Sequence, residues 1–137
     1  MIEIVVARHS NENVSWLGLI RLHTTHRITL YNKGSPLKGI VQGYYEIGQE
    51  VDPYLHHIVT RWDTLADWTI FTSGNPSEFV KGGEFAKLLV PVPVGLLWRN
   101  PSLFAASKQH IQSKPVDYYK NCKLTWPIFE ELGSANV

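Results

Sequence analysis

Runs of apolar residues predict three strands, and each run ends in a polar turn. The first run is rich in β-branched side chains, whereas the second and third alternate apolar with polar positions. Short runs of this kind, closed by Gly, Asn, Ser and Pro, are typical of strands that end in loops. The predicted strands are residues 2–7, 26–31 and 67–72, and the polar turns that follow them are residues 8–13, 32–36 and 73–76.

One helix is predicted with a defined start. Asp52 can accept hydrogen bonds from the first helical N–H groups, and Pro53 suits the first helical position. Apolar residues then recur at helical spacing as far as Trp62, and we expect the helix to end near residues 63–64. Beyond residue 76, four prolines divide the chain into short pieces. Shorter helical segments are predicted at residues 13–20, 108–114 and 116–123.

This succession of strands and helices predicts a single α/β domain over residues 1–137. Strand–helix–strand units favour a mostly parallel sheet flanked by helices, because consecutive parallel strands need a crossover connection. Parallel strands all end at one edge of the sheet, and ligands of open α/β sheets bind along that carboxyl edge. The loops 8–13, 32–35 and 73–75 are therefore expected to converge on one concave surface, which is the candidate site.

Composition and charge narrow the classes of function. The chain has 137 residues, with 13 Lys and Arg scattered among 12 Asp and Glu, and this net charge of +1 argues against general nucleic-acid binding. No apolar stretch reaches the roughly 20 residues of a membrane span, and the N-terminus has no signal-peptide pattern. The single cysteine, Cys122, has no internal disulfide partner, which suits a reducing compartment. These features favour a cytoplasmic location.

Six blocks of sequence, spread over most of the chain, match those of a known family in their order. They are ARHSNENVSWL (7–17), ITLYNKG (28–34), EIGQE (46–50), YLHHI (54–58), ADWTIF (66–71) and FAASKQHIQSKPVDYY (104–119). Together they resemble an uncharacterised domain family of fungi, bacteria and large viruses, and a viral source would imply the host cell cytoplasm. That family is similar to small nucleotide-sugar glycosyltransferases of the GT-A fold, so the resemblance implies a reduced GT-A-like, Rossmann-related fold.

The resemblance also implies an activity, a donor and an acceptor. Such enzymes transfer a sugar from a nucleoside diphosphate donor to a glycan or protein acceptor. An Asp-x-Asp motif in them holds Mn²⁺ or Mg²⁺ at the diphosphate. Here Ser73-Gly74-Asn75 takes that position with neutral oxygens, so we expect no metal site unless nucleotide phosphates help to hold the ion. The alternative is a catalytically inactive module that keeps nucleotide-sugar or glycan binding.

Arg8 has the clearest chemistry among the candidate binding residues. At the end of the first strand, its guanidinium can donate two parallel hydrogen bonds to a phosphate. A structural pair with Glu12 or Glu50 is the alternative, and both interpretations stay open. Asn13 likewise suits either a nucleoside contact or a helix cap. The expected nucleotide-binding residues are Arg8, His9, Glu12, Asn13, Asn32, Lys33, Glu50, Ser73, Gly74 and Asn75.

Three residues are candidates for proton transfer. His57 lies on the predicted helix beside His56, and histidine titrates near neutral pH, although most such residues are structural. Glu130 and Glu131 lie near the C-terminus, where the resemblance places the base of an inverting transfer. That base takes the proton of the acceptor hydroxyl. A solvated charge at a helix end is the alternative for both glutamates.

Overall fold

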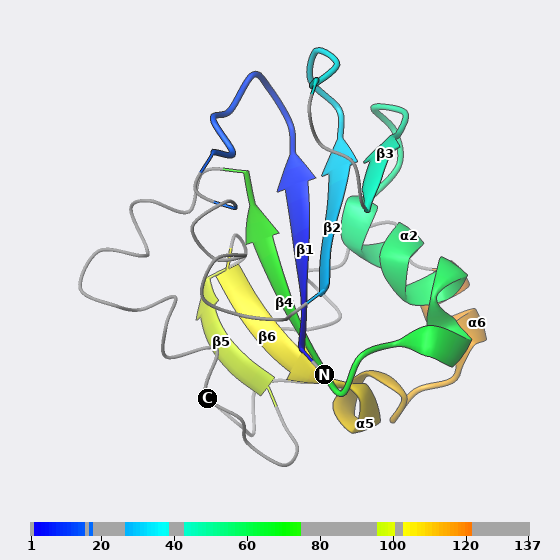
Figure 1. Cartoon of the computed structure of the whole chain (residues 1–137). Coiled ribbons are helices and arrows are strands. Elements are labelled where there is room, and N and C mark those ends of the chain that lie inside the picture. The colour runs from blue at the N-terminus through cyan, green and yellow to red at the C-terminus, as the bar shows by residue number, and fades with distance from the viewer. Residues whose placement is uncertain are drawn as a thin grey trace.

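A computed structural model of the chain describes residues 2–15, 17, 27–38, 43–74, 96–100 and 103–121, which form one six-stranded sheet with helices packed on it (Figure 1). The strand order is β3-β2-β1-β4-β6-β5. The strands are β1 (Ile2–Arg8), β2 (Arg27–Asn32), β3 (Tyr44–Glu46), β4 (Trp68–Ser73), β5 (Leu96–Asn100) and β6 (Leu103–Ser107). The helices are α2 (Pro53–Thr60), α5 (Lys108–Ile111) and α6 (Val116–Lys120), with a 3-10 turn η1 (Trp62–Thr64) after α2.

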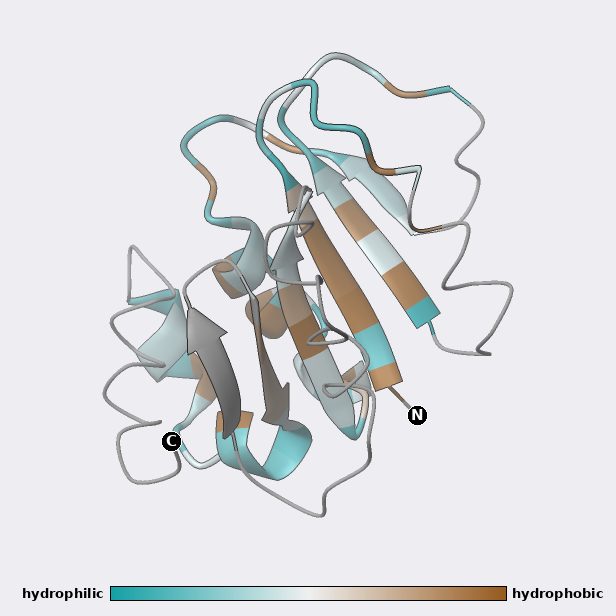
Figure 2. Ribbon diagram, turned by 90° about the vertical axis from the view of Figure 1, so that its left-hand side faces the viewer, coloured by the Kyte–Doolittle hydropathy of each residue, from teal (hydrophilic) through white to brown (hydrophobic). Residues whose placement is uncertain are grey.

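The three predicted strands are confirmed as β1, β2 and β4, and they are neighbours in the sheet. β1 pairs in parallel with β2 on one side and with β4 on the other. Because β1 is buried along its whole length, its apolar residues form a nearly continuous run. Figure 2 shows β1 mostly hydrophobic and the loops beyond the strand ends mostly hydrophilic. β1, β2 and β4 therefore lie in the interior of the sheet and end in polar loops.

The sheet is mixed, which corrects the expectation of a mostly parallel sheet. β3 pairs in parallel with β2, but β6 runs antiparallel to both β4 and β5. Two residues separate β5 from β6, which is too short for the crossover that parallel pairing needs. Sequence patterns did not indicate β3, β5 or β6. β3 has three residues, and the prolines before and between β5 and β6 suggested irregular chain.

Helix α2 begins as predicted. Asp52 Oδ1 accepts hydrogen bonds from the backbone N–H groups of Tyr54 at 3.0 Å and Leu55 at 3.1 Å, and Pro53 opens the helix. α2 ends at Thr60, and η1 continues to residue 64, close to the predicted end. α5 and α6 lie within the other predicted segments but are shorter. Half of the predicted helix over residues 13–20 lies outside the described residues.

Two apolar clusters pack on the two faces of the sheet. The cluster on one face joins side chains of β1, β2, β4 and β6 to α2, α5 and α6, which lie on the same side of the sheet in Figure 1. The cluster on the other face includes Val14 and Leu17. Burying a large apolar side chain such as Phe71 stabilises the fold by about 1.5–3 kcal/mol. Within the described part of the chain, no helix is long and apolar enough to cross a membrane.

Candidate functional site

The ends of the three predicted strands lie at one edge of the sheet. Arg8, the last residue of β1, is level with Asn32 of β2, and Ala7 is level with Ser73 of β4. Because the three strands are parallel, the loops after them leave the sheet at the same edge. The structure therefore brings Arg8, Asn32 and Ser73 to a shared edge, as expected. That these residues bind a ligand stays a prediction.

The strand order reverses at this edge. From β1 the sheet continues to β2 and β3 on one side, and β4 lies on the other side of β1. The position between the ends of β1 and β4 is therefore a topological switch point, where open α/β sheets bind their ligands. Arg8 and Ser73 end the two strands there. The loop that follows β1 contributes Glu12, whose carboxylate lies close to Gly74.

Arg8 is buried at this edge, with 4% of its surface exposed. Its Nε donates to the backbone oxygen of Glu12 at 2.9 Å, and its Nη1 donates to Asn32 Oδ1 and to the backbone oxygen of Ser35, both at 2.8 Å. These bonds join the loop after β1 to the loop after β2. The structural alternative for Arg8 was an ion pair with Glu12 or Glu50. No such pair occurs among the described residues, and neutral oxygens accept from Arg8 instead.

Asn32 is buried and uses its whole amide within the protein. Its Oδ1 accepts from Arg8 and from the backbone N–H of Gly34. Its Nδ2 donates to the Tyr44 hydroxyl and to the backbone oxygen of Ser35, both at 2.9 Å. Asn32 therefore holds the turn after β2 and links it to β3, and its contact with a ligand stays a prediction.

Glu12 brings a carboxylate to the switch point. Its Oε1 accepts from the backbone N–H of His9 at 3.0 Å. A Cβ on Gly74 would lie 2.8 Å from that oxygen, so the Glu12 side chain occupies space that Gly74 leaves open. Asn13 is exposed, and its Oδ1 accepts from the backbone N–H of Ser15, the local turn favoured by a capping residue.

Lys33 and Glu50 lie on the loops beside this edge. The backbone N–H of Lys33 donates to the backbone oxygen of Arg8 at 2.8 Å. Lys33 Nζ donates to the backbone oxygen of Gln49 at 2.8 Å, and Gln49 Nε2 donates to the backbone oxygen of Lys33 at 2.7 Å. Glu50 is exposed, with its carboxylate close to Gly48. Lys33 thus joins the loop after β2 to the loop after β3, and its charged Nζ lies against Gln49.

His57 lies in a buried hydrogen-bond network on the α2 face of the sheet. Its surface is 0% exposed, and its Nε2 lies 3.2 Å from Glu3 Oε1 and its Nδ1 2.8 Å from the Tyr31 hydroxyl. Glu3 precedes Arg8 by five residues, about 17 Å along a strand. Because an ionised carboxylate only accepts, Nε2 donates to Glu3, and Nδ1 of a neutral ring accepts from Tyr31. His57 is therefore placed in the core, and its role in proton transfer stays a prediction.

The pKa values of Glu3 and Tyr31 in this network both lie further from neutral pH than usual. Burial disfavours ionised Glu3, but hydrogen bonds from His57, Arg27 and Thr29 outweigh it and lower the pKa of Glu3 to about 2. Burial raises the pKa of Tyr31 to about 12. At pH 7, Glu3 is therefore a carboxylate and Tyr31 a neutral hydroxyl. Sequence reasoning missed this network, although a glutamate inside the first apolar run was a signal for it.

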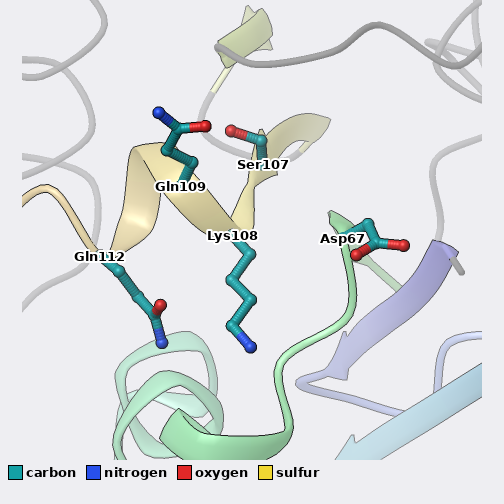
Figure 3. Close-up of a pocket in the computed structure, with 5 residues that line it drawn as sticks. All are labelled: Asp67, Ser107, Lys108, Gln109 and Gln112. Atoms are coloured by element: carbon teal, nitrogen blue, oxygen red, sulfur yellow. The ribbon is translucent and has the colours of Figure 1, made fainter.

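A pocket of about 490 Å³ lies at the opposite, amino edge of the parallel strands. Figure 3 shows the side chains of Lys108 and Gln112 extending to one side of α5, whereas those of Ser107 and Gln109 point to the other side. Because these polar groups do not converge on one position, we assign no ligand to this pocket. Its lining residues are Asp67, Ser107, Lys108, Gln109 and Gln112.

The carboxyl edge offers few ligands for a metal ion. Ser73 and Gly74 supply neutral oxygens, and Glu12 is the carboxylate beside them. Across the residues that the structure describes, no three His, Cys, Asp or Glu side chains are grouped to hold a metal ion. This set of donors does not fit a divalent cation, which prefers several carboxylate oxygens. Three predicted site residues lie outside the described residues, namely Asn75, Glu130 and Glu131.

Fold and site together define an α/β protein with a mixed sheet and polar loops at a topological switch point. Residues 4–82 match a family described as proteins of unknown function (DUF3431), and because the match spans more than half of the chain, the chain belongs to this family. The expectation that the chain belongs to an uncharacterised family is thus confirmed. The matched segment includes all three strand ends and α2. No curated protein and no solved structure matches the chain.

Proposed function

We propose that this chain binds a nucleoside diphosphate sugar at the carboxyl edge of its sheet and transfers the sugar to a glycan or protein acceptor. The observation that supports the proposal best is the switch point between β1 and β4, where Arg8, Glu12 and Gly74 come together. The order β3-β2-β1-β4 also occurs within the 3-2-1-4-5-6 order of doubly wound sheets that bind dinucleotides. We propose that the sheet is a reduced GT-A-like fold.

The residues at the edge have distinct proposed roles. Arg8 presents a guanidinium to the diphosphate, and Lys33 adds positive charge beside it. The Glu12 carboxylate accepts from a hydroxyl of the ribose or sugar. Transfer requires a base to take the acceptor hydroxyl's proton while its oxygen bonds the sugar carbon and the nucleoside diphosphate leaves with the bonding electrons. Glu130 and Glu131 are the proposed bases.

A second candidate is a module that binds a nucleotide sugar or glycan without catalysis. The sequence Ser73-Gly74-Asn75 favours this candidate, because it replaces a metal-binding motif by neutral groups. A diphosphate leaving group needs its growing charge neutralised, and without that help the bond to the sugar breaks slowly. A module that binds the nucleotide sugar would bind the same donor at the same edge as the transferase, so binding and transfer need separate tests.

Thermal unfolding with a panel of nucleoside diphosphates and nucleotide sugars tests binding. A ligand present at about 100 times its Kd stabilises the folded protein by about 2.7 kcal/mol, so a matching base should raise the Tm clearly. Lys120→Gln is the control, because it removes an exposed charge on α6, and it should respond like the wild type. An unchanged Tm with every compound in the panel would contradict the proposal.

Release of nucleoside diphosphate from the bound donor tests transfer. We expect wild-type protein to release it faster when a suitable glycan or peptide acceptor is added, and we expect Glu130→Gln or Glu131→Gln to abolish this acceleration. Both variants should still bind the donor. If the donor binds but no acceptor speeds the release of nucleoside diphosphate, the result would favour the binding module over the transferase.

A further inference from the structure

Arg8 is a buried cation whose hydrogen-bond acceptors are all neutral. With 4% of its surface exposed, it donates to the backbone oxygens of Glu12 and Ser35 and to the amide oxygen of Asn32. These bonds satisfy N–H groups but bring no negative charge. Burying a charge is costly unless an opposite charge compensates it. The edge of the sheet therefore holds positive charge that a ligand can neutralise.

The carboxylates of this edge do not provide that compensation. The ion pairs within the described part of the chain do not include Arg8. Glu12 Oε1 accepts from the backbone N–H of His9 and lies against Gly74, and the Glu50 carboxylate lies against Gly48. The guanidinium of Arg8 is thus held in place by polar groups and left without an anionic partner among the described residues.

One end of the guanidinium remains available to a ligand. Nε and Nη1 of Arg8 make the three bonds given above, and Nη2 donates to none of the described residues. Arginine binds phosphate through N–H groups that lie in one plane. The three hydrogen bonds to the protein hold the guanidinium of Arg8 in one orientation. Arg8 ends β1, so its guanidinium belongs to the same edge of the sheet as the switch point, where a diphosphate is proposed to lie.

The switch point between β1 and β4 has few oxygen ligands suited to a divalent ion. Ser73 and Gly74 end β4 with neutral oxygens, and Glu12 supplies the one carboxylate found beside Gly74 in the described part of the chain. Resting on the proposed function, we infer that the Arg8 guanidinium takes the place of a divalent cation and that the site binds a nucleoside diphosphate in the absence of metal. Lys33, whose Nζ is held by Gln49, contributes a second positive charge.

Titration calorimetry on the wild-type protein tests this inference without any substitution. The probes are inorganic pyrophosphate and the nucleoside diphosphate that gives the largest rise in Tm, each measured with EDTA and with Mn²⁺. We expect the Kd of each probe to differ by less than about threefold between the two conditions, which is well under 1 kcal/mol. Binding that appears with Mn²⁺ and disappears with EDTA would overturn the inference and leave the proposed function standing.

Substitutions of Arg8 test the residue itself. Arg8→Gln removes the charge and Arg8→Lys removes the planar donors, so both should weaken metal-free binding by about tenfold to a hundredfold, the range of charged hydrogen bonds. Lys120→Gln is the charge-matched control and should bind like the wild type. Circular dichroism and the unfolding midpoint verify that each variant is folded. A folded Arg8→Gln protein with wild-type affinity would overturn the inference.

The outcomes separate the inference from the function on which it rests. Suppose that pyrophosphate binds in the presence of EDTA and that the nucleoside diphosphate binds no more tightly than pyrophosphate. This result would support the role of Arg8 and contradict a nucleotide site. Failure of both probes to bind in either condition would contradict both. If the Arg8 variants do not fold, the comparison of EDTA with Mn²⁺ on the wild type still decides whether metal is required.

Discussion

Gly34, in the loop after β2, lies close to the backbone of the loop after β1. A Cβ at this position would collide with the backbone oxygen of Ser10 and would lie 2.8 Å from Arg8 Nη1. Neither neighbour can move away easily, because one is backbone and the other is a buried group with three hydrogen bonds. Glycine is therefore required here by close approach. The hydrogen bonds of Arg8 depend on the space that Gly34 leaves.

Gly34→Ala should lower the free energy of unfolding by about 1–3 kcal/mol, because it forces extra volume into a packed loop. Urea unfolding followed by tryptophan fluorescence measures the loss. Gly48→Ala is the matched control. Its Cβ would meet the end of the exposed Glu50 side chain, which can swing aside, so the expected change is below about 0.5 kcal/mol. Equal losses in the two variants would contradict this account of Gly34.

Helix α2 forms one wall of the core and holds His57 against the sheet. Its first turn depends on Asp52, whose Oδ1 accepts from the N–H groups of Tyr54 and Leu55. Without this cap, those N–H groups would have no acceptor in the helix, since the first turn lacks a preceding carbonyl. The cap therefore sets where α2 starts and keeps its register against β1 and β2.

Asp52→Ala should lower the free energy of unfolding by about 1 kcal/mol, the usual effect of losing an N-cap oxygen. Asp52→Asn keeps an oxygen in the same place and should lose clearly less. Urea unfolding followed by circular dichroism compares the two variants with the wild type. A loss of the same size in Asp52→Asn would show that the charge of Asp52, rather than its capping oxygen, is what stabilises the protein.

A buried network around Glu3 joins distant parts of the chain. Arg27 Nη2 donates to Glu3 Oε1 at 2.7 Å and to the backbone oxygen of Thr64 at 3.0 Å, and His57 donates to the same carboxylate from α2. β1, β2, α2 and η1 thus meet at one carboxylate. Protonation of Glu3 would weaken bonds to all of these elements together, so its effect extends to the whole fold.

Stability should therefore fall in acid in a defined range. Because the pKa of Glu3 is lowered from 4.5 to about 2, the unfolded chain binds this proton first as the pH falls. The contribution of Glu3 is complete above pH 4.5 and is lost as the pH falls toward 2, and it amounts to about 3 kcal/mol. Urea unfolding at a series of pH values between these limits measures the loss.

Glu3→Gln provides the comparison for that series. It should be less stable than the wild type at pH 7 and should lose less stability between pH 4.5 and 2, because it has no proton to bind. Glu46→Gln, which alters an exposed glutamate of β3, should follow the wild-type curve. Parallel curves for the wild type and Glu3→Gln would mean that other groups cause the acid sensitivity.

Local patterns in the sequence were enough to identify β1, β2, β4 and the start of α2. A continuous β-branched run reflects a strand buried on both faces, and Asp52 followed by Pro53 suits a helix start whatever surrounds it. Parallel strands then place Arg8, Asn32 and Ser73 at one edge. The strand runs and the start of α2 depend on neighbours within a few residues, and that is why the sequence alone reveals them.

Contacts between distant segments were settled by the folded structure alone. The antiparallel pairing of β6 depends on β4, which ends thirty residues earlier, and no local pattern encodes it. The acceptors of Arg8 include backbone oxygens, which every residue type possesses, so the sequence left a carboxylate pair open. His56 and His57 give the same signal in the sequence, yet neighbours on a helix point about 100° apart. The packing of α2 on the sheet buries His57 and makes it the partner of Glu3.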